Sequence, residues 1–195
     1  MASEREEAKR AAFRAQMAPL ASERLIVVDE TSTHTAMTRR YARAPRGERA
    51  YGSVPRNHGA NLSVIGALGL RGMMATMSVD GAVDTEVFDV FVNQVLVPAL
   101  QPGEVVLLDN LTVHHASTIA QAVSTVGGTV RFLPSYSPDF SPIEPCCSKL
   151  KTCLRSGAAR TRTLLEDALT KALLTLRPAD IRGWFHHRGY KVAVK

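Results

Sequence analysis

The sequence predicts an α/β domain built around a mixed sheet. Two short, wholly apolar runs, Leu25–Val28 and Val105–Leu108, are typical of strands buried on both faces. Two further runs, Leu62–Leu68 and Met73–Val79, flank the turn residues Gly69–Gly72 and predict a hairpin. Strands come first, strands and helices then alternate, and helices follow, which is the order expected of a layered α/β fold.

The other elements are mostly helices whose ends carry recognisable breakers. A helix from about Glu4 to Met17 is stopped by Pro19, and Asp84 to Leu100 has apolar residues at helical spacing. The segment from Arg39 to Arg56 contains Pro and Gly and is expected to be irregular or to lie at the edge of the sheet. The further expected elements are a helix over 116–126, a strand over 129–133 and helices over 142–156, 163–176 and 178–187.

A chain of 195 residues is long enough for one well-cored domain and short for two. Its 45% hydrophobic and 22% charged residues are typical of a globular protein. No apolar run reaches the roughly 18 to 20 residues of a membrane span, and the charged N-terminus lacks the apolar core of a signal peptide. The three cysteines, two of them adjacent at Cys146 and Cys147, favour reduced, buried thiols in a cytosolic protein over a disulfide framework or a zinc site.

Charge is unevenly distributed along the chain, although the net charge is only +6. Six arginines and one glutamate lie between Arg39 and His58, and eleven Lys or Arg and three acids follow Glu144. The stretch from Gly59 to Glu144 has two arginines against eight acids. Basic flanks around an acidic centre are typical of a protein that binds a polyanion and holds cations, with an ordinary solvated surface as the alternative.

Two carboxylates follow the two apolar runs: Asp29 comes after Leu25–Val28, and Asp109 after Val105–Leu108. A carboxylate placed where a buried strand leaves its sheet faces the crevice in which α/β proteins bind ligands. If the two strands are parallel neighbours, the carboxylates come together and repel each other unless a cation lies between them. Mg²⁺ prefers such oxygen ligands. The alternative is that each aspartate caps the turn after its strand.

Glu144 is a third candidate carboxylate, at the start of a predicted helix. The local sequence Ser141-Pro142-Ile143-Glu144 fits a capping box, in which Ser141 is the N-cap and Glu144 reaches back to its backbone. On local chemistry alone, Glu144 is therefore a helix-capping residue.

Longer strings around these carboxylates resemble the acidic motifs of a known family. They are VVDET at 27–31, LLDNLTVH at 107–114 and LPSYSPDFSPIE at 133–144. With the thirty-four residues between Asp109 and Glu144, they resemble the DDE transposases of the IS-six-thirty family, bacterial insertion sequences related to mariner elements. Supporting matches at 39–47, 64–68, 148–151 and 183–190 extend the resemblance over nearly the whole chain.

The resemblance implies a ribonuclease H-like fold, with a mixed five-stranded sheet flanked by helices and the first and fourth strands adjacent. It also implies an N-terminal linker helix over residues 1–20 and a DDE catalytic domain over 21–190. The implied activity is metal-dependent cleavage of DNA at the ends of an insertion sequence, followed by strand transfer into target DNA. The implied location is the cytoplasm of a bacterium, at the nucleoid.

Roles for individual residues also follow from the resemblance. Asp29, Asp109 and Glu144 are the expected catalytic residues and the ligands of two Mg²⁺ ions, for which Mn²⁺ can substitute. Asn110 and His114 are expected to support these ligands or to contact DNA. The alternative is that they are ordinary polar residues of a turn. The expected partners are the element's terminal repeats, target DNA, a second copy of the chain and an upstream helix-turn-helix frame. Phosphate contacts are expected from Arg39, Arg40, Arg43, Arg46, Arg49, Lys149, Lys151 and Arg155.

The sequence departs from the family pattern near Glu144. Ser141 and Cys147 stand where the family has an Asn and an aromatic residue, and Pro145 is inserted in the first helical turn. The departures leave two alternatives open. One is a weakened or inactive DNA-binding remnant of a transposase, and the other is a different ribonuclease H-like nuclease such as a junction resolvase.

Overall fold

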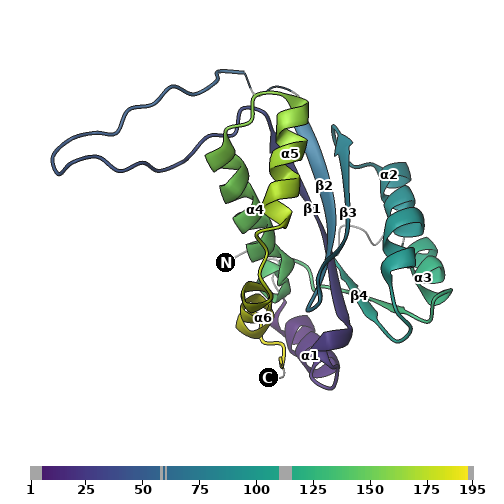
Figure 1. The fold of residues 1–195 in the computed structure, drawn as a ribbon. Helices are drawn as coiled ribbons and strands as arrows, with labels where there is room; N and C mark the ends of the chain where they lie inside the picture. The colour runs from purple at the N-terminus through teal and green to yellow at the C-terminus, as the bar shows by residue number, and fades with distance from the viewer. Residues whose placement is uncertain (1–5, 58, 60, 110–115, 193–195) are drawn as a thin grey trace.

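Five strands form one mixed sheet in the order β3-β2-β1-β4-β5 (Figure 1). The computed structural model describes residues 6–57, 59, 61–109 and 116–192. β1 pairs antiparallel with β2 and parallel with β4, so the first and fourth strands are neighbours, as predicted. The strands are β1 (Leu25–His34), β2 (Asn61–Gly69), β3 (Gly72–Asp80), β4 (Val105–Leu108) and β5 (Thr129–Phe132).

The first strand is longer than predicted. β1 runs on past Val28 to His34, because β2 pairs with it along its whole second half, up to the pair His34 and Asn61. The parallel pairing with β4 stops earlier, at Val27 and Leu107. Asp29 therefore lies within β1, opposite Gly66 of β2, and not at a strand end as expected. It does lie at the point where β1 separates from β4.

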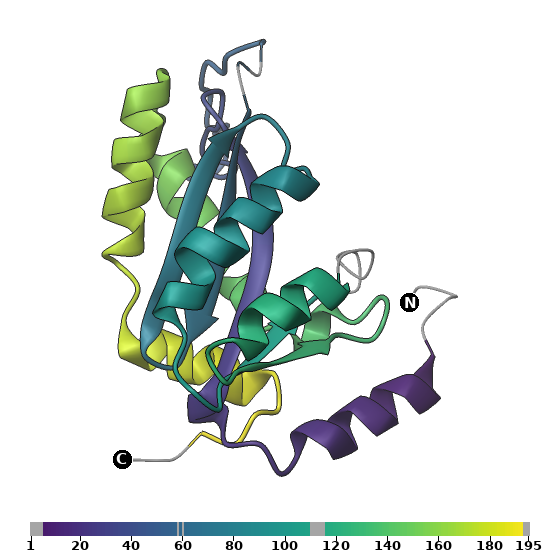
Figure 2. The ribbon, with the colours of Figure 1, turned by 90° about the vertical axis from the view of Figure 1, so that its right-hand side faces the viewer.

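Helices cover both faces of the sheet (Figures 1 and 2). One face carries α4 (Ile143–Gly157), α5 (Arg162–Leu173) and α6 (Pro178–His187). The other carries α2 (Thr85–Val90) and α3 (Ala116–Ser124). The predicted 84–100 helix is present but irregular: α2 continues as a π-helical segment, Phe91–Leu96, and a 3₁₀ turn, Val97–Ala99. Further 3₁₀ turns span Ser22–Arg24 and Pro138–Phe140, and α1 (Glu7–Met17) crosses one end of the molecule.

The central strands divide their side chains between two cores. Leu25 and Val27 of β1 belong to the cluster under α4 and α6, whereas Ile26 and Val28 belong to the cluster under α2 and α3. This alternation is the ordinary period of two in a strand, and it explains why the run is apolar on both sides. Phe13 and Met17 of α1 join the first cluster. The boundary at residue 20 stays a prediction.

The Arg-rich segment has no regular secondary structure, as predicted. Residues Arg39 to Arg56, called the arm below, form a long extended loop that projects from the body (Figure 1). Its root is fixed by Arg160, which donates hydrogen bonds to the carbonyl oxygens of Thr35 (2.8 Å) and Met37 (3.0 Å). Within the described part of the chain, no helix has the length and apolarity needed to cross a bilayer.

Candidate active site

The alternation of side chains along β1 turns Asp29 towards α4. Asp29 has the same parity as Leu25 and Val27, whose side chains pack beneath that helix. Asp109 directly follows β4, and Glu144 lies in the first turn of α4. All three carboxylates line one cavity of about 390 Å³. The other lining residues are Val28, Leu133, Ser135, Tyr136, Ser137, Pro138 and Ser141.

Gly66 leaves room for the start of α4 above the sheet. It is paired with Asp29, and directly paired residues project to the same face. A Cβ at Gly66 would lie 3.1 Å from Met73 Sδ and 3.8 Å from Ile143 Cδ1, the residue before Glu144. The missing side chain therefore allows the α4 N-terminus to approach β1 and to bring Glu144 to Asp29.

Asp29 has the perturbed titration expected of a carboxyl group in an acidic crevice. Burial raises its pKa to about 6, and the charges of Glu144 and Asp109 add to the rise. A hydrogen bond of 2.8 Å from the Glu30 N–H opposes this rise by stabilising the carboxylate. The three acids are thus close enough to repel one another, and a cation among them would relieve this repulsion.

Glu144 does not form the capping box that its local sequence suggests. The N-cap of α4 is Pro142, and no side-chain hydrogen bond caps this helix end. Ser141 is buried and precedes the N-cap. The structure thus corrects the capping interpretation, because the short turn Pro138–Phe140 brings the chain into α4 one residue later than the box requires. The exposed Glu144 side chain faces the cavity instead.

The donor set fits a hard divalent cation. Carboxylate oxygens from β1, the end of β4 and α4 are the ligands that Mg²⁺ and Mn²⁺ take. Burial raises the pKa of Asp29 first and the charges of Glu144 and Asp109 add to the rise, and a cation would offset both effects. In the described ranges, no three His, Cys, Asp or Glu side chains form a preassembled metal site. The carboxylates share a crevice without forming a closed cage, which suits Mg²⁺ because this ion usually keeps several waters and binds substrate phosphates.

One wall of the cavity is a loop to which the sequence assigned no role. Residues 135–138 all line the cavity, and Tyr136 is 58% exposed there. Tyr136 has a positive φ of 53°, which is uncommon for a residue with a side chain and recurs at functional sites. The strings that carry the family resemblance contain this loop, but nothing in their residue types predicted its conformation.

The adjacent cysteines are packing residues beside the acids. Cys146 is fully buried, Cys147 nearly so, and all three thiols of the chain are free. Burial raises the pKa of Cys147 to about 12, and the charges of Asp29, Cys146 and Glu144 add to it. The Cys147 thiol therefore stays protonated at neutral pH. A neutral thiol fills the space under α4 without adding charge to the acidic crevice.

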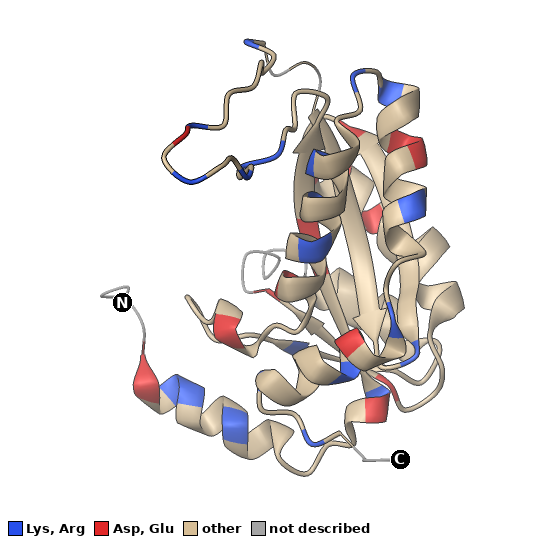
Figure 3. Ribbon diagram, turned by 60° about the vertical axis from the view of Figure 1, so that its left-hand side comes forward, with Lys and Arg blue, Asp and Glu red and all other residues tan. Residues whose placement is uncertain are grey.

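The expected phosphate contacts fall into two groups. The five arginines of the arm that were expected to contact phosphate are exposed, and Figure 3 shows blue residues along the projecting arm. Lys151 and Arg155 are half-buried on α4. Burial lowers the pKa of Arg155, and the positive charge of Arg40 adds to this effect, so the root of the arm and the last turn of α4 lie near each other. Together they extend a basic surface from the acidic cavity along the arm.

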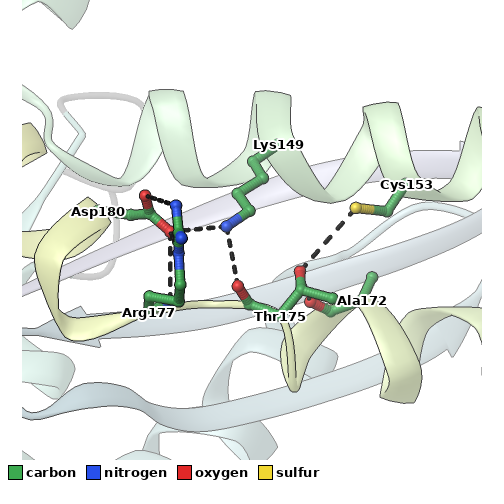
Figure 4. Close-up of polar contacts among 6 residues, drawn as sticks. All are labelled: Lys149, Cys153, Ala172, Thr175, Arg177 and Asp180. Atoms are coloured by element: carbon green, nitrogen blue, oxygen red, sulfur yellow. Dashed lines mark hydrogen bonds and ion pairs between the residues drawn. The ribbon is translucent and has the colours of Figure 1, made fainter.

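Lys149 pairs with other residues of the protein, and its expected role as a phosphate contact stays a prediction. Its Nζ donates to Asp180 Oδ2 (2.7 Å) and to the Thr175 carbonyl oxygen (2.8 Å), as Figure 4 shows. Arg177 also donates to Asp180, and with Lys149 it lowers the pKa of that carboxyl well below its usual range. Lys149 thus fastens α4 to the start of α6. Asn110 and His114 lie outside the described residues.

The sheet order, the helices on both faces and the acids beside the β1–β4 junction define a ribonuclease H-like protein with a carboxylate-lined site. Residues 24–166 match the family model described as DDE superfamily endonuclease, and the chain belongs to that family. No curated protein sequence matches the chain.

Solved structures of Mos1 transposase are similar in fold. The paired-end complex with the left transposon end gives a TM-score of 0.75 at 15% identity, over 94% of this chain and 57% of that one. The Mos1 mariner paired-end complex with Mn gives 0.71 at 16% identity, over 95% and 60%. The Mos1 catalytic domain with Raltegravir and Mg gives 0.66 at 13% identity, over 91% and 85%. The chain thus spans 57% to 60% of the Mos1 chains in the two complexes.

Proposed function

We propose that this chain is the catalytic domain, over residues 21–190, of a transposase of the IS-six-thirty family. It cuts DNA at the ends of an insertion sequence and joins the freed ends to target DNA, in the cytoplasm of a bacterium. The observation that carries the proposal is the convergence of Asp29, Asp109 and Glu144 on one cavity. Solved relatives described as a paired-end complex and a strand transfer complex support DNA as the partner.

In this proposal the three acids hold two Mg²⁺ or Mn²⁺ ions. Ions held by Asp29, Asp109 and Glu144 would supply Lewis-acid activation of the attacking oxygen and stabilisation of the leaving oxygen in a phosphodiester displacement. Asp29 lies in β1, Asp109 directly follows β4, and Glu144 comes from the first turn of α4, so the three acids reach the cavity from three elements. Relatives solved with Mg and with Mn support this choice of metals.

The DNA backbone lies along the basic surface formed by the arm, Lys151 and Arg155. The exposed arm arginines are free to follow phosphates outside the cavity, and such contacts release counterions and depend strongly on salt. Recognition of the terminal repeats belongs to a helix-turn-helix frame upstream, and two copies of the chain act together on paired ends.

An inactive remnant is the second candidate, because Ser141, Pro145 and Cys147 depart from the family pattern. The geometry supports the active form. Pro145 lies in the first turn of α4, where a missing N–H costs no helical hydrogen bond, and α4 runs for 15 residues. Cys147 is packed against the core without disturbing the helix.

The deciding experiment is cleavage of DNA that carries the element ends, with Mn²⁺ or Mg²⁺ and any upstream partner frame. The wild-type protein is expected to nick at the ends and then to join them to a target, and Asp109→Ala should lose both reactions. Glu86→Gln, an exposed acid on α2, is the matched control and should cut like the wild type. Absence of cutting by the complete assembly under both metals would establish the inactive remnant. Cutting without strand transfer would favour a resolvase-like nuclease.

A further inference from the structure

Helix α1 buries a charged residue against the active-site loop. Its buried residues are Arg10, Phe13 and Met17, which lie on one face at helical spacing. The Arg10 side chain is 0% exposed, although it carries a full charge. Burying a guanidinium costs desolvation free energy unless the group is paired and hydrogen-bonded. The contacts of Arg10 therefore show which part of the protein it stabilises.

The hydrogen bonds of the Arg10 guanidinium reach the segment before α4, and its Nε also lies 3.4 Å from Glu7 Oε1 on its own helix. The guanidinium donates to both carboxylate oxygens of Asp139 (3.0 and 2.5 Å) and to Ser137 Oγ (2.7 Å). Its charged carbon lies 4.2 Å from the centre of the Phe140 ring, a cation–π contact. A bidentate pair between an arginine and a carboxylate fixes both the distance and the relative orientation of the two groups, which a lysine could not reproduce.

Two aromatic residues reinforce the same contact. Phe13 of α1 stacks on Phe140, with ring centres 5.1 Å apart. Tyr190, after α6, donates its hydroxyl hydrogen to the Phe140 carbonyl oxygen (2.8 Å). Phe140 is thus held on its ring by α1 and on its backbone by the C-terminal segment, and the next residues lead directly into α4 and Glu144.

The fixed segment is also the wall of the candidate active site. Ser137 and Pro138 line the cavity, and Ser137 Oγ donates to the Ser135 carbonyl oxygen (3.1 Å), next to the strained Tyr136. A residue with a side chain, such as Tyr136, keeps a left-handed backbone conformation only where contacts with neighbouring residues stabilise it. One side-chain contact that holds this wall comes from Arg10, more than 120 residues away in sequence.

We propose that Arg10 is a positioning residue for this cavity, a role that rests on the proposed function. Its hydrogen bonds to Ser137 and Asp139 and its cation–π contact with Phe140 hold the cavity wall and the first turn of α4 in position. They therefore set the distance of Glu144 from Asp29. Arg10 is not among the residues that line the cavity. It acts through the loop, so its loss should loosen the site without removing a ligand.

The direct test is hydrogen exchange of the amides from 135 to 144 in Arg10→Met. Methionine keeps the length and apolar contact of the side chain and removes the bidentate pair, and the half-exposed Asp139 can turn to water. Exchange in this segment is expected to be about tenfold faster than in the wild type. Lys9→Met is the matched control, because the neighbouring Lys9 is exposed and pairs with Glu6, the N-cap of the same helix. If both variants exchange like the wild type, the inference is wrong. Should Arg10→Met fail to fold, Asp139→Asn decides by the same measurement.

The second readout is the Mn²⁺ concentration that gives half-maximal nicking. Arg10→Met should raise it and lower the maximal rate about ten- to a hundredfold, because displacements of about 1 Å have effects of this size. Val123→Ala, buried in the opposite core, controls for a general loss of stability and should leave the metal dependence unchanged. An unchanged metal dependence in Arg10→Met would overturn the inference. If the wild type never nicks, the proposed function fails, and hydrogen exchange still decides the role of Arg10.

Discussion

At the scale of single residues, the carboxyl group of Asp29 is held at an energetic cost. Its pKa of about 6 means that the folded protein binds this proton more tightly than the unfolded chain does. Ionisation of Asp29 therefore destabilises the metal-free protein, and this loss of stability develops as the pH rises from about 4 to about 6. With a cation bound to the carboxylate, ionisation of Asp29 would instead stabilise the protein.

We expect Asp29→Asn to stabilise the metal-free protein at pH 8 by about 1–3 kcal/mol and to abolish metal-dependent cleavage. The gain should disappear at about pH 4, where the wild-type carboxyl is already neutral. Thermal unfolding with and without EDTA across this pH range checks it. Glu30→Gln, the exposed neighbour, serves as the control and should give no comparable gain. Equal melting temperatures for Asp29→Asn and the wild type at pH 8 would contradict the proposed repulsion.

At the scale of elements, the approach of α4 to the β1–β2 pair depends on Gly66. We expect Gly66→Val to displace Ile143 and the first turn of α4, because even a Cβ would meet Met73 Sδ at 3.1 Å. Such overpacking costs about 1–3 kcal/mol, and Mn²⁺ binding should weaken further because Glu144 moves with the helix. Calorimetric Mn²⁺ titration and thermal unfolding measure the two effects. Gly183→Ala, with nothing within 4 Å, is the control. Undiminished Mn²⁺ affinity in Gly66→Val would show that the α4 position does not depend on this contact.

The connection between α4 and α6 gives a second prediction at this scale. Lys149→Met removes the bond to Asp180 and should lower the melting temperature by a few degrees while DNA affinity stays within about twofold of the wild type. Lys151→Met, two residues along the same helix, should show the opposite pattern, with weaker DNA binding and an unchanged melting temperature. Paired unfolding and DNA-binding titrations distinguish them. A large loss of DNA affinity in Lys149→Met would instead support the phosphate contact that the sequence predicts.

At the scale of the whole molecule, the proposed function assigns DNA binding to the arm and catalysis to the acidic cavity. Replacing Arg43, Arg46 and Arg49 with alanine should weaken DNA binding and reduce the slope of log affinity against log salt by up to about 3, since each lost phosphate contact contributes roughly 0.9. Titrations at several salt concentrations give this slope. The fold should be unaffected because the three residues are fully exposed. Lys171→Ala, an exposed cation on α5, is the control, and an unchanged slope in the arm variant would place the DNA elsewhere.

The sequence by itself determined the layers, most element positions and the identity of the three acids. Wholly apolar runs and glycine or proline breakers are local signals, so they located β4, the β2–β3 hairpin and the helices within a few residues. Motif and spacing singled out Asp29, Asp109 and Glu144, and the cavity contains all three. The length of β1 was missed because its second half is set by pairing with β2, a partner that a local pattern does not reveal.

Only the tertiary structure decided how those acids are held and which basic residues are free. Arg10 meets Asp139 across 129 positions of the chain, and Lys149 meets Asp180 across 31, so neither pairing leaves a trace in local sequence. Glu144 has the local sequence of a helix cap, but the 3₁₀ turn before α4 places it where it lines the cavity. Hydrophobic periodicity encodes which face of an element is buried, whereas polar contacts depend on which distant elements the packed core brings together.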